Sequence, residues 1–415
     1  MATGLSGDAL AALTAAVDTS GAADPAIAFN PTPAARRELV EGAVVEVPAM
    51  GYTVVDRAVR AANPGVEMGD RWMSNGVLRV EWDDAGRLTS IWDDVHQREV
   101  VAAGRAANVF HLHHDHPAEY DAWDVDRSYL DAYEELTGRV TIDVAAPGEG
   151  QARARFRRRF GDSSIDQTMV LQAGSRRLDF VTEVEWHERH RFLKVAFPVG
   201  VHTDRATFEI QFGHVSRPTH ENTSWEQARF EVCAHRWADL SETGYGVALL
   251  NDCKYGYDVR GNVLRLSLLR SPTAPDPTCD QGHHRFTYAL LPHAGDPFAG
   301  GVLEAAASLD SPLVVVPVAS RSGPLPATMS FVSVDDPAFV VVAVKRADDG
   351  SGDVVVRGYE AWGGHRRVRL DVAVPFTRAG RTDLLERRRH DLPVERNAVV
   401  LTLRPFELVT IRLSP

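Results

Sequence analysis

The 415-residue chain contains no long apolar run, no paired-cysteine motif and no excess of positive charge. Without an uncharged apolar stretch of about 18 residues, it has no candidate for a membrane-spanning helix. The three cysteines, Cys233, Cys253 and Cys279, form no C-x-x-C motif, so nothing predicts a disulfide framework or a cysteine-based zinc site. The net charge of −12, from 45 basic and 57 acidic residues, argues against nucleic acid as a partner.

Signals for several common activities are also missing. The chain has neither a G-x-G-x-x-G nor a G-x-x-x-x-G-K-[ST] phosphate loop, and it lacks the G-x-S-x-G turn of serine hydrolases. Residues 1–17 contain no lysine or arginine, so they lack the basic segment of a secretory signal. Together with the scarcity of cysteine, this predicts a cytoplasmic protein.

The composition is that of an ordinary globular protein, 44% hydrophobic and 25% charged, and the length predicts two or three domains. Near the N-terminus, Asp8–Val17 is rich in alanine and places Leu10, Leu13 and Val17 at helical spacing. This spacing predicts one short helix. A linker at Gly21–Pro25 follows it.

Beyond the linker the hydrophobic period becomes two. Val77–Trp82 and Arg87–Trp92 flank Asp83–Gly86, a pattern typical of a β-hairpin. Alternating runs recur at residues 180–186, 208–212, 259–268, 339–344, 354–356, 368–374 and 406–413. Many short strands with turn signals and little helical periodicity predict an antiparallel all-β protein.

The predicted domain order has four parts. We expect a helical segment at 1–22, a linker and small β segment at 23–68, a large two-sheet β-sandwich at 69–310 and a smaller C-terminal β-sandwich at 325–415. The boundary before the smaller sandwich is predicted from the four prolines between residues 312 and 326, because such stretches are typical of linkers.

The densest cluster of potential metal ligands is His111-Leu112-His113-His114-Asp115-His116. In a strand, alternation places His111 and His113 on one face and His114 and His116 on the other. Two imidazoles do not make a metal site. We therefore predict a polar loop or strand end and no metal ion.

One polar stretch suits carbohydrate binding better, and a second polar stretch is left open. In Tyr120–Asp124, the carboxylates of Asp121 and Asp124 flank Trp123; an indole ring stacks on the apolar face of a sugar and carboxylates accept hydrogen bonds from hydroxyls. The alternative is a buried tryptophan whose neighbouring aspartates cap turns. Arg217–Trp225 is a long polar loop that bears an aromatic residue and is either functional or held by hydrogen bonds.

Two further constellations do not support catalysis. His220 with Asp239 or Glu242 and a serine could be drawn as a triad, but nothing in the sequence brings them together. Cys253 is followed by Lys254, which in a strand points to the opposite face and so cannot activate the thiol.

Taken in order, many segments of the chain resemble glycoside hydrolase family 38, the α-mannosidases, and most closely the cytosolic and vacuolar branch of that family. The resemblance extends from about residue 25 to the C-terminus, and its motifs are Asn75–Gly76, Arg98–Glu99, Tyr120–Asp124, Trp186–His190, Leu193–Pro198, Gln211–Gly213, Arg217–His220, Asn222–Trp225, Ala238–Glu242, Asn251–Tyr257, Leu266–Pro272 and Pro405–Glu407.

The resemblance covers only the C-terminal half of such an enzyme. Family members begin with a β/α-barrel that holds a zinc ion and an aspartate nucleophile, followed by a helical bundle and β-sandwiches. This sequence has no counterpart of the family's Gly-His-x-His-x-Asp zinc motif, so no catalytic or metal-binding residue is assigned to it. The resemblance implies zinc in the missing catalytic domain, a bundle remnant at 1–22 and a large sandwich like that of galactose mutarotase.

The same resemblance implies a role in the hydrolysis of terminal α-linked mannose, with retention, during mannose and glycan catabolism. The sandwich would contribute to the substrate rim, for which we predict Asp121, Trp123, Asp124, Arg217, His220 and Trp225. The implied partners are α-mannosides or mannose-containing oligosaccharides, the barrel domain in cis or in trans, and a second copy in a homo-oligomer. Because retaining hydrolysis needs two carboxylates about 5–5.5 Å apart, and no such pair is identified, we expect the chain alone to be inactive.

Two other interpretations remain open from the sequence. One is a free-standing carbohydrate-binding module in which Trp123 or Trp225 stacks on mannose. The other is a mutarotase-like sugar enzyme, which requires a histidine and a glutamate in one groove.

Overall fold

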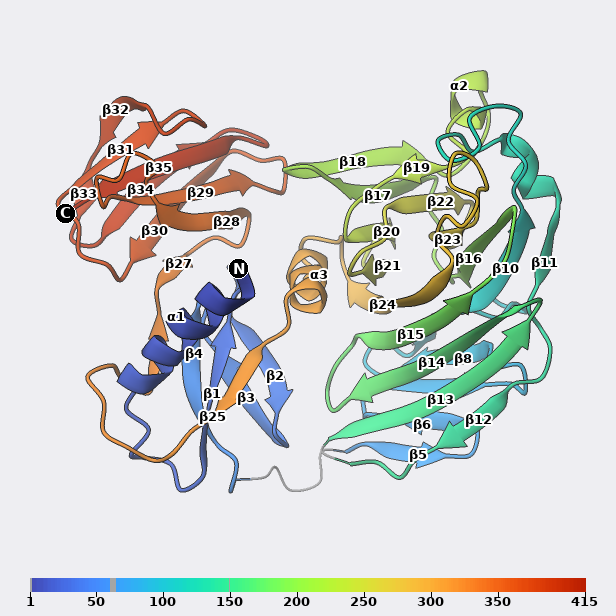
Figure 1. Ribbon diagram of the computed structural model, residues 1–415, viewed down its shortest axis with the longest axis horizontal. Helices are drawn as coiled ribbons and strands as arrows, with labels where there is room; N and C mark the ends of the chain where they lie inside the picture. The colour runs from blue at the N-terminus through green and yellow to red at the C-terminus, as the bar shows by residue number, and fades with distance from the viewer. Residues whose placement is uncertain (1, 60–64, 149) are drawn as a thin grey trace. The chain divides into compact units, whose positions relative to one another are not determined.

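The computed structural model describes residues 2–59, 65–148 and 150–415. It divides into two units, a small unit of Met1–Ala62, Gln211–His214 and Ser311–Pro415, and a large unit of Asn63–Ile210 and Val215–Asp310 (Figure 1). Strands dominate both units, so the predicted all-β class is confirmed.

The large unit contains three antiparallel sheets. The nine-stranded sheet has the order β12 (Thr141–Val144), β13 (Gln151–Phe160), β14 (Ser163–Gln172), β15 (Leu178–Trp186), β24 (Gly282–Ala294), β21 (Tyr245–Asn251), β20 (Trp237–Glu242), β17 (Arg205–Ile210) and β18 (Gly213–Pro218). The six-stranded sheet has the order β11 (Tyr133–Glu135), β10 (Val109–His114), β16 (Arg191–Pro198), β23 (Val263–Arg270), β22 (Gly256–Arg260) and β19 (Val232–Cys233).

The third sheet of the large unit has the order β5 (Glu67–Gly69), β6 (Trp72–Ser74), β7 (Leu78–Trp82), β8 (Leu88–Asp93) and β9 (Arg98–Glu99). Its β7–β8 pair is the hairpin predicted from the sequence. One apolar core joins all three sheets, with Ile91 of β8, Phe110 of β10 and Phe180 of β15 almost fully buried in it. The period of two explains this core, because alternate side chains of each strand point to the same face.

The non-strand elements of the large unit are the 3₁₀ turn η1 (Arg127–Asp131) and the helices α2 (Ser224–Gln227) and α3 (Val302–Asp310). Thr223 caps α2 through a capping box: the Glu226 N–H donates to its hydroxyl, and its own N–H donates to the Glu226 carboxylate.

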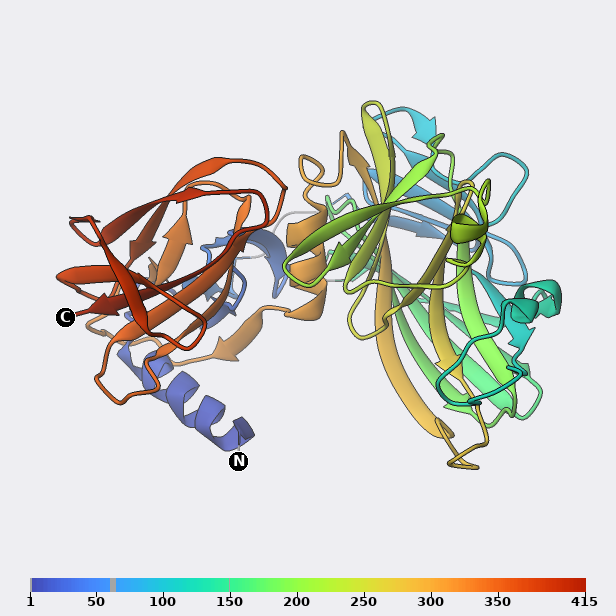
Figure 2. The same ribbon diagram turned by 90° about the horizontal axis from the view of Figure 1, so that it is seen from above.

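The small unit contains the C-terminal sandwich, drawn in orange and red in Figure 2, and a separate small sheet. One sheet of the sandwich has the order β27 (Val332–Val334), β30 (Arg366–Val372), β34 (Ala398–Leu403) and β33 (Val394–Glu395). The other has the order β28 (Phe339–Arg346), β29 (Val354–Glu360), β35 (Leu408–Ser414), β31 (Arg378–Thr382) and β32 (Arg388–Leu392). Their core includes Val356, Leu370 and Ile411, none of which is exposed.

The small sheet combines two strands from the N-terminal part of the chain with two strands that precede the C-terminal sandwich in sequence. Its order is β25 (Val314–Pro317), β1 (Pro25–Asn30), β4 (Gly51–Asp56) and β26 (Thr328–Ser330), beside the hairpin β2 (Arg36–Val40) and β3 (Ala43–Val47). Helix α1 (Ala2–Ala16) confirms the predicted N-terminal helix. Leu10 and Leu13 of that helix pack on the core of this sheet.

The proline-rich stretch from 312 to 326, predicted as a boundary, contains β25, which pairs with β1 from Ala26↔Pro317 to Phe29↔Val314. Three consecutive valines favour a strand. Pro317 is tolerated because β25 is an edge strand.

None of the helices in the described part of the chain has the length and apolar character that crossing a membrane requires.

Candidate functional site

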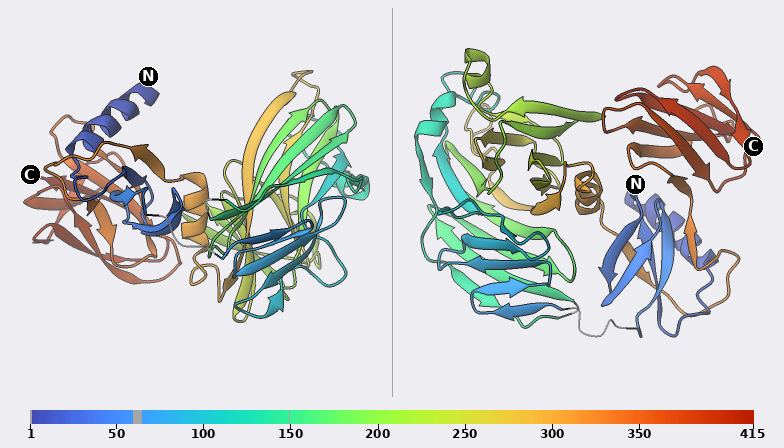
Figure 3. Two further views of the ribbon diagram at one scale, coloured as in Figure 1. Left: turned by 90° about the horizontal axis from the view of Figure 1, so that it is seen from below. Right: turned by 180° about the vertical axis from the view of Figure 1, so that it is seen from behind.

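Of three loops of the large unit, residues 115–132, 219–231 and 271–281, the first contacts both of the others, and we call the three the loop platform. Figures 1 and 3 show η1 and α2, which belong to two of these loops, on the same side of the unit. Arg127 of the first loop lies 3.0 Å from Glu221 of the second (Nη2 to Oε2). Most of the predicted rim residues therefore lie in or beside one connected region.

Arg270, the last residue of β23, ties the first loop to the third. Its guanidinium pairs with the buried carboxylate of Asp115 at 2.8 Å and donates to the carbonyl oxygen of Asp124 at 2.7 Å. Since the third loop begins at the next residue, this arginine fixes the start of one loop against the backbone of another.

A row of polar side chains crosses the six-stranded sheet next to the platform. In the ladder, Glu135 of β11 lies opposite His111 of β10, His111 opposite Lys194 of β16, and Lys194 opposite Ser267 of β23. The alternation that sends Leu193 into the apolar core turns Lys194 to the other face.

Lys194 is completely buried among charged partners. Its ammonium lies 2.7 Å from Asp258 Oδ2 and also contacts the Glu231 carboxylate, while Arg265 pairs with Asp258 Oδ1 at 2.7 Å. We call these four residues the Lys194 cluster; their charges sum to zero. Burial alone would raise the pKa of Asp258, but Lys194 and Arg265 outweigh it and hold that pKa below its usual value.

The Lys194 cluster holds two of the platform loops. Tyr129, which is buried in η1, donates from its hydroxyl to Glu231 Oε2 at 2.9 Å. Burial is the main reason that the pKa of Tyr129 is raised, so its hydroxyl stays protonated and can donate. Ser267 donates to the other oxygen of Glu231. The platform is therefore anchored to the sheet through a buried, hydrogen-bonded network.

The histidine cluster takes the alternating arrangement predicted for it. His111 and His113 are buried on one face, and both rings pack on Tyr133, with centroid distances of 4.7 and 4.8 Å. Burial lowers the pKa of His111 to about 3 and that of His113 to about 4, so both are neutral at pH 7. His113 Nδ1–H donates to the Tyr129 carbonyl at 2.9 Å.

His114, the last residue of β10, and His116, which lies beyond the end of the strand, are both exposed. His116 stacks on His190, with ring centroids 4.8 Å apart, and Arg191 lies 3.0 Å from His114 Nε2.

The carboxylate of Asp121 binds the backbone of the third platform loop. Its Oδ2 accepts hydrogen bonds from the backbone N–H groups of Thr273 at 2.7 Å and Ala274 at 3.1 Å. Burial alone would raise the pKa of Asp121, but these two donors and the nearby His190 outweigh it and lower that pKa. Asp124 is exposed, and its Oδ1 accepts the next residue's N–H at 2.9 Å.

Trp123 is 74% exposed, in contrast to the alternative of a buried tryptophan. A turn positions it, because its backbone N–H donates to the Tyr120 carbonyl at 2.7 Å, where Tyr120 has a φ of 56°. A shallow groove of about 470 Å³ lies beside it, lined also by Tyr120, Asp121, His190 and Pro275. The groove thus offers aromatic and imidazole faces.

Arg217 and His220 line a separate, narrow crevice of about 30 Å³. The Arg217 guanidinium lies 4.7 Å from the Phe208 ring centroid, and burial lowers the pKa of Arg217. His220 Nδ1 lies 3.3 Å from Glu226 Oε2. Trp225, on α2, is 77% exposed and lines neither the groove nor the crevice.

The structure thus brings Asp121 and Trp123 together in one groove and Arg217 and His220 together in another. The residues that sequence reasoning missed are those that support the loops: Lys194, Glu231, Asp258, Arg270 and Thr273. One signal was available, since Lys194 is one of only three lysines in the chain and interrupts an apolar strand.

Comparison with known proteins identifies the family of the chain. Residues 73–278 match the family model described as "Glycosyl hydrolases family 38 C-terminal domain". Residues 338–411 match "Glycosyl hydrolases family 38 C-terminal beta sandwich domain". The chain belongs to glycoside hydrolase family 38. The first match includes the loop platform except its last residues, and the second lies within the C-terminal sandwich.

Curated relatives confirm the predicted family and branch. The family 38 chain is 44% identical to "Alpha-mannosidase 2C1" of Homo sapiens over 387 residues, covering 89% of this chain and 37% of the relative. It is 34% identical to "Alpha-mannosidase" of Saccharomyces cerevisiae, covering 82% of this chain and 34% of the relative. The chain therefore spans little more than a third of the length of these relatives.

A solved structure shares the fold of the family 38 chain. An alpha-mannosidase from Enterococcus faecalis V583 superposes with a TM-score of 0.78 at 17% sequence identity, covering 98% of this chain and 58% of that one.

The residues of this chain do not fit the zinc ion that the family implies. Within residues 2–59, 65–148 and 150–415, no group of three or more His, Cys, Asp or Glu side chains could hold a metal ion. His111 and His113, the two histidines that share one face of β10, are buried against Tyr133. No step is therefore assigned to zinc on these residues.

Proposed function

We propose that this chain forms the C-terminal β-sandwich region of an α-mannosidase that releases terminal α-linked mannose in mannose and glycan catabolism. The observation that carries the proposal is the 44% identity to a named α-mannosidase over 89% of this chain and 37% of that enzyme. In this proposal the catalytic carboxylates and the zinc belong to a barrel domain, in cis or in trans, and the sandwich alone does not hydrolyse mannosides.

The loop platform is the proposed carbohydrate contact. The indole rings of Trp123 and Trp225 are 74% and 77% exposed, although a tryptophan side chain is usually largely buried. An exposed indole can stack on the apolar face of a mannose ring, and the exposed carboxylate of Asp124 can accept hydrogen bonds from its hydroxyls. Asp121, whose oxygen already accepts two backbone N–H groups, is proposed as a positioning residue.

Arg217 and His220 are proposed as rim residues that act indirectly. The crevice they share is too small for a sugar, and His220 lies against Glu226, the residue that closes the capping box of α2. Their proposed role is to hold α2, and with it Trp225, in place.

The proposal also places the protein in the cytoplasm, and a homo-oligomer is compatible with it. Cys233, Cys253 and Cys279 are free, as suits a reducing compartment.

The test is a calorimetric titration of the chain with an α-linked mannose disaccharide. Trp123→Ala and Trp225→Ala should each weaken binding by up to about tenfold, since an aromatic contact contributes about 0.5–1.5 kcal/mol and tenfold corresponds to about 1.4 kcal/mol. Tyr255→Ala is the matched control, because Tyr255 is 63% exposed in the same unit but lies outside the platform. Equal affinity of all four proteins would reject the platform as the sugar contact.

A free-standing binding module differs from this proposal in one measurable respect. A module needs no partner, so its sugar affinity would not change when a family 38 catalytic domain is added. A mutarotase-like enzyme would need a histidine and a glutamate in one groove. His111 and Glu135 approach to 3.7 Å, but His111 is buried against Tyr133. His220 and Glu226 lie 3.3 Å apart and line one crevice, but its volume of about 30 Å³ is too small for a sugar.

A further inference from the structure

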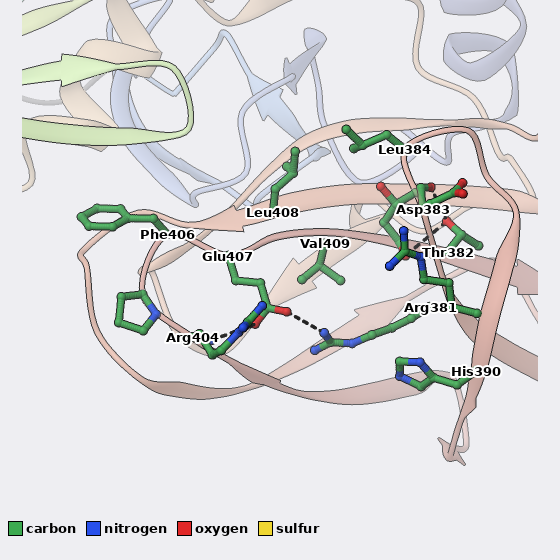
Figure 4. Close-up of a pocket in the computed structure, with 13 residues that line it drawn as sticks. Arg381, Thr382, Asp383, Leu384, His390, Arg404, Phe406, Glu407, Leu408 and Val409 are labelled. Carbon is green, nitrogen blue, oxygen red and sulfur yellow. Dashed lines mark hydrogen bonds and ion pairs between the residues drawn. The ribbon is translucent and has the colours of Figure 1, made fainter.

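A groove of about 630 Å³ lies in the C-terminal sandwich, within the small unit. It is lined by the ends of β31, β32 and β35 and by the turn Arg404–Glu407 between β34 and β35. Arg381 of β31 donates to the Thr402 carbonyl of β34, in the opposite sheet, at 2.8 Å. Figure 4 shows Arg404, Glu407, Arg381 and His390 following one another along the groove.

The carboxylates of this groove already accept hydrogen bonds from neighbouring groups of the protein. Glu407 accepts Arg381 Nη1 at 2.9 Å and the Arg404 backbone N–H at 2.9 Å. Asp383 accepts the backbone N–H groups of Leu385 and Arg387, each at 3.0 Å. Burial alone would raise the pKa of Glu407, but Arg404 and Arg381 outweigh it and lower that pKa. Both groups are therefore ionised and occupied at pH 7.

The positive groups are in excess of these carboxylates. Of the run Arg387-Arg388-Arg389, the first pairs with Asp383 at 2.8 Å and the second with Asp391 at 2.9 Å. Arg389 is exposed and has no hydrogen bond or ion pair among the described residues. Arg404 keeps 77% of its side chain exposed, with Nε 3.6 Å from Glu407.

His390 adds a further polar group to the same part of the groove. It lies directly opposite Arg381 in the β31–β32 ladder and is exposed. Neither His390 nor Arg389 has a carboxylate partner in the described part of the chain, so both can donate to a ligand.

The charge of the surrounding sandwich fits an anionic ligand. Residues 325–415 contain 14 Lys and Arg against 12 Asp and Glu, a net charge of +2, whereas the whole chain has −12. The positive field is therefore local. This argues for a small anion and against a long polyanion such as nucleic acid, which the remaining acidic surface would repel.

We propose that this groove binds the phosphate group of a small phosphate ester. Guanidinium groups recognise the oxygens of phosphate with pairs of charge-assisted hydrogen bonds, and Arg389 and Arg404 have donors to spare. The 57% exposed Leu384 and 43% exposed Phe406 line the same groove and offer an apolar surface to the organic part of the ester. The volume is in the usual range for small-molecule sites.

The test is isothermal titration calorimetry of the full chain at low ionic strength with inorganic phosphate, glucose 6-phosphate and glucose. The variants are Arg389→Gln and Arg404→Gln. Arg346→Gln is the matched control, because Arg346 is exposed in the same sheet but on β28, the edge opposite β32. Thermal melting of each variant confirms that it is folded.

The expected result is saturable binding of a phosphate compound that weakens about tenfold in Arg389→Gln and in Arg404→Gln, equal to about 1.4 kcal/mol. Arg346→Gln should bind as the parent does, and glucose should not bind. Tighter binding of glucose 6-phosphate than of phosphate assigns the ligand to a phosphorylated sugar, whereas equal affinities assign it to free phosphate. No saturable binding by either compound, or binding that both variants leave intact, would overturn the proposal. The α-mannosidase assignment does not depend on this outcome.

Discussion

Replacing Lys194 by methionine tests whether the Lys194 cluster anchors the loop platform. The cluster contains two cations and two carboxylates, and Lys194 is fully buried between Glu231 and Asp258. Methionine keeps the length of the side chain but leaves the cluster with a net charge of −1 inside the protein. Breaking a buried ion pair by removing one partner costs about 3–5 kcal/mol, so we expect Lys194→Met to destabilise the large unit by about that amount at pH 7.

The loss of stability in Lys194→Met should become smaller as the pH falls. In the parent, Lys194 and Arg265 hold the pKa of Asp258 below its unfolded value, so this carboxylate stabilises the fold above about pH 4. In the variant Asp258 loses the Lys194 charge that lowers its pKa, so the folded pKa of Asp258 rises. A raised folded pKa favours the folded state at low pH. The destabilisation relative to the parent should therefore shrink between pH 7 and pH 5.

Urea unfolding at both pH values measures these quantities. Tryptophan fluorescence reports on the large unit, because Trp186 and Trp237 are buried in it. Arg155→Met is the matched control: Arg155 pairs with Asp166 at an exposed site of the same unit, where an ion pair contributes about 0–1 kcal/mol. A loss of stability below about 1 kcal/mol in Lys194→Met, or a loss that grows as the pH falls, would show that the Lys194 cluster does not stabilise the large unit in this way.

Three further predictions concern the same region. His111 and His113 have folded pKa values of about 3 and about 4, below the unfolded value of about 6.5. Their contribution to the stability of the fold is therefore fully present above about pH 6.5. It is lost as the pH falls towards 4, by up to about 1.4 kcal/mol per pH unit for each residue. Urea midpoints of the His111→Asn variant should therefore fall less steeply than those of the parent between pH 6.5 and 4.5, and equal slopes would count against burial as the cause. Asp121→Ala should cost about 1–2 kcal/mol, because the Thr273 and Ala274 N–H groups lose their acceptor, and a melting temperature equal to that of the parent would show that this anchor is dispensable. Thr223→Ala should lower stability by about 1 kcal/mol through loss of the α2 cap and should weaken the disaccharide binding assigned to Trp225; unchanged affinity would separate the cap from the sugar contact.

The sequence predicted those features that depend on neighbouring residues. The period of two around Asp83–Gly86 predicted the β7–β8 hairpin, and the same period placed His111 and His113 on one face. Helical spacing of leucines predicted α1. In each case the signal lies within a few residues of the chain, where backbone geometry alone decides which side chains share a face.

The supporting contacts could not be predicted because they join distant segments. Asp121 accepts from Thr273, 152 residues further along the chain. Lys194 reaches Glu231 and Asp258 only because of the register of β16 on β23, which shifts between Leu193 and Lys194. Likewise, Val314–Pro317 becomes a strand because β1 offers it a partner edge. Sheet register and loop packing arise from the whole fold, and no local pattern encodes them.

We infer that this chain is a β-sandwich region of an α-mannosidase and lacks the catalytic groups. The most direct measurement is release of 4-nitrophenol from 4-nitrophenyl α-mannoside by the purified 415-residue chain, with and without added zinc. A mock purification from the same host lacking the chain provides the control for contaminating enzymes. We expect no release above that control under either condition. Zinc-dependent release that co-purifies with the chain and is absent from the control would contradict it.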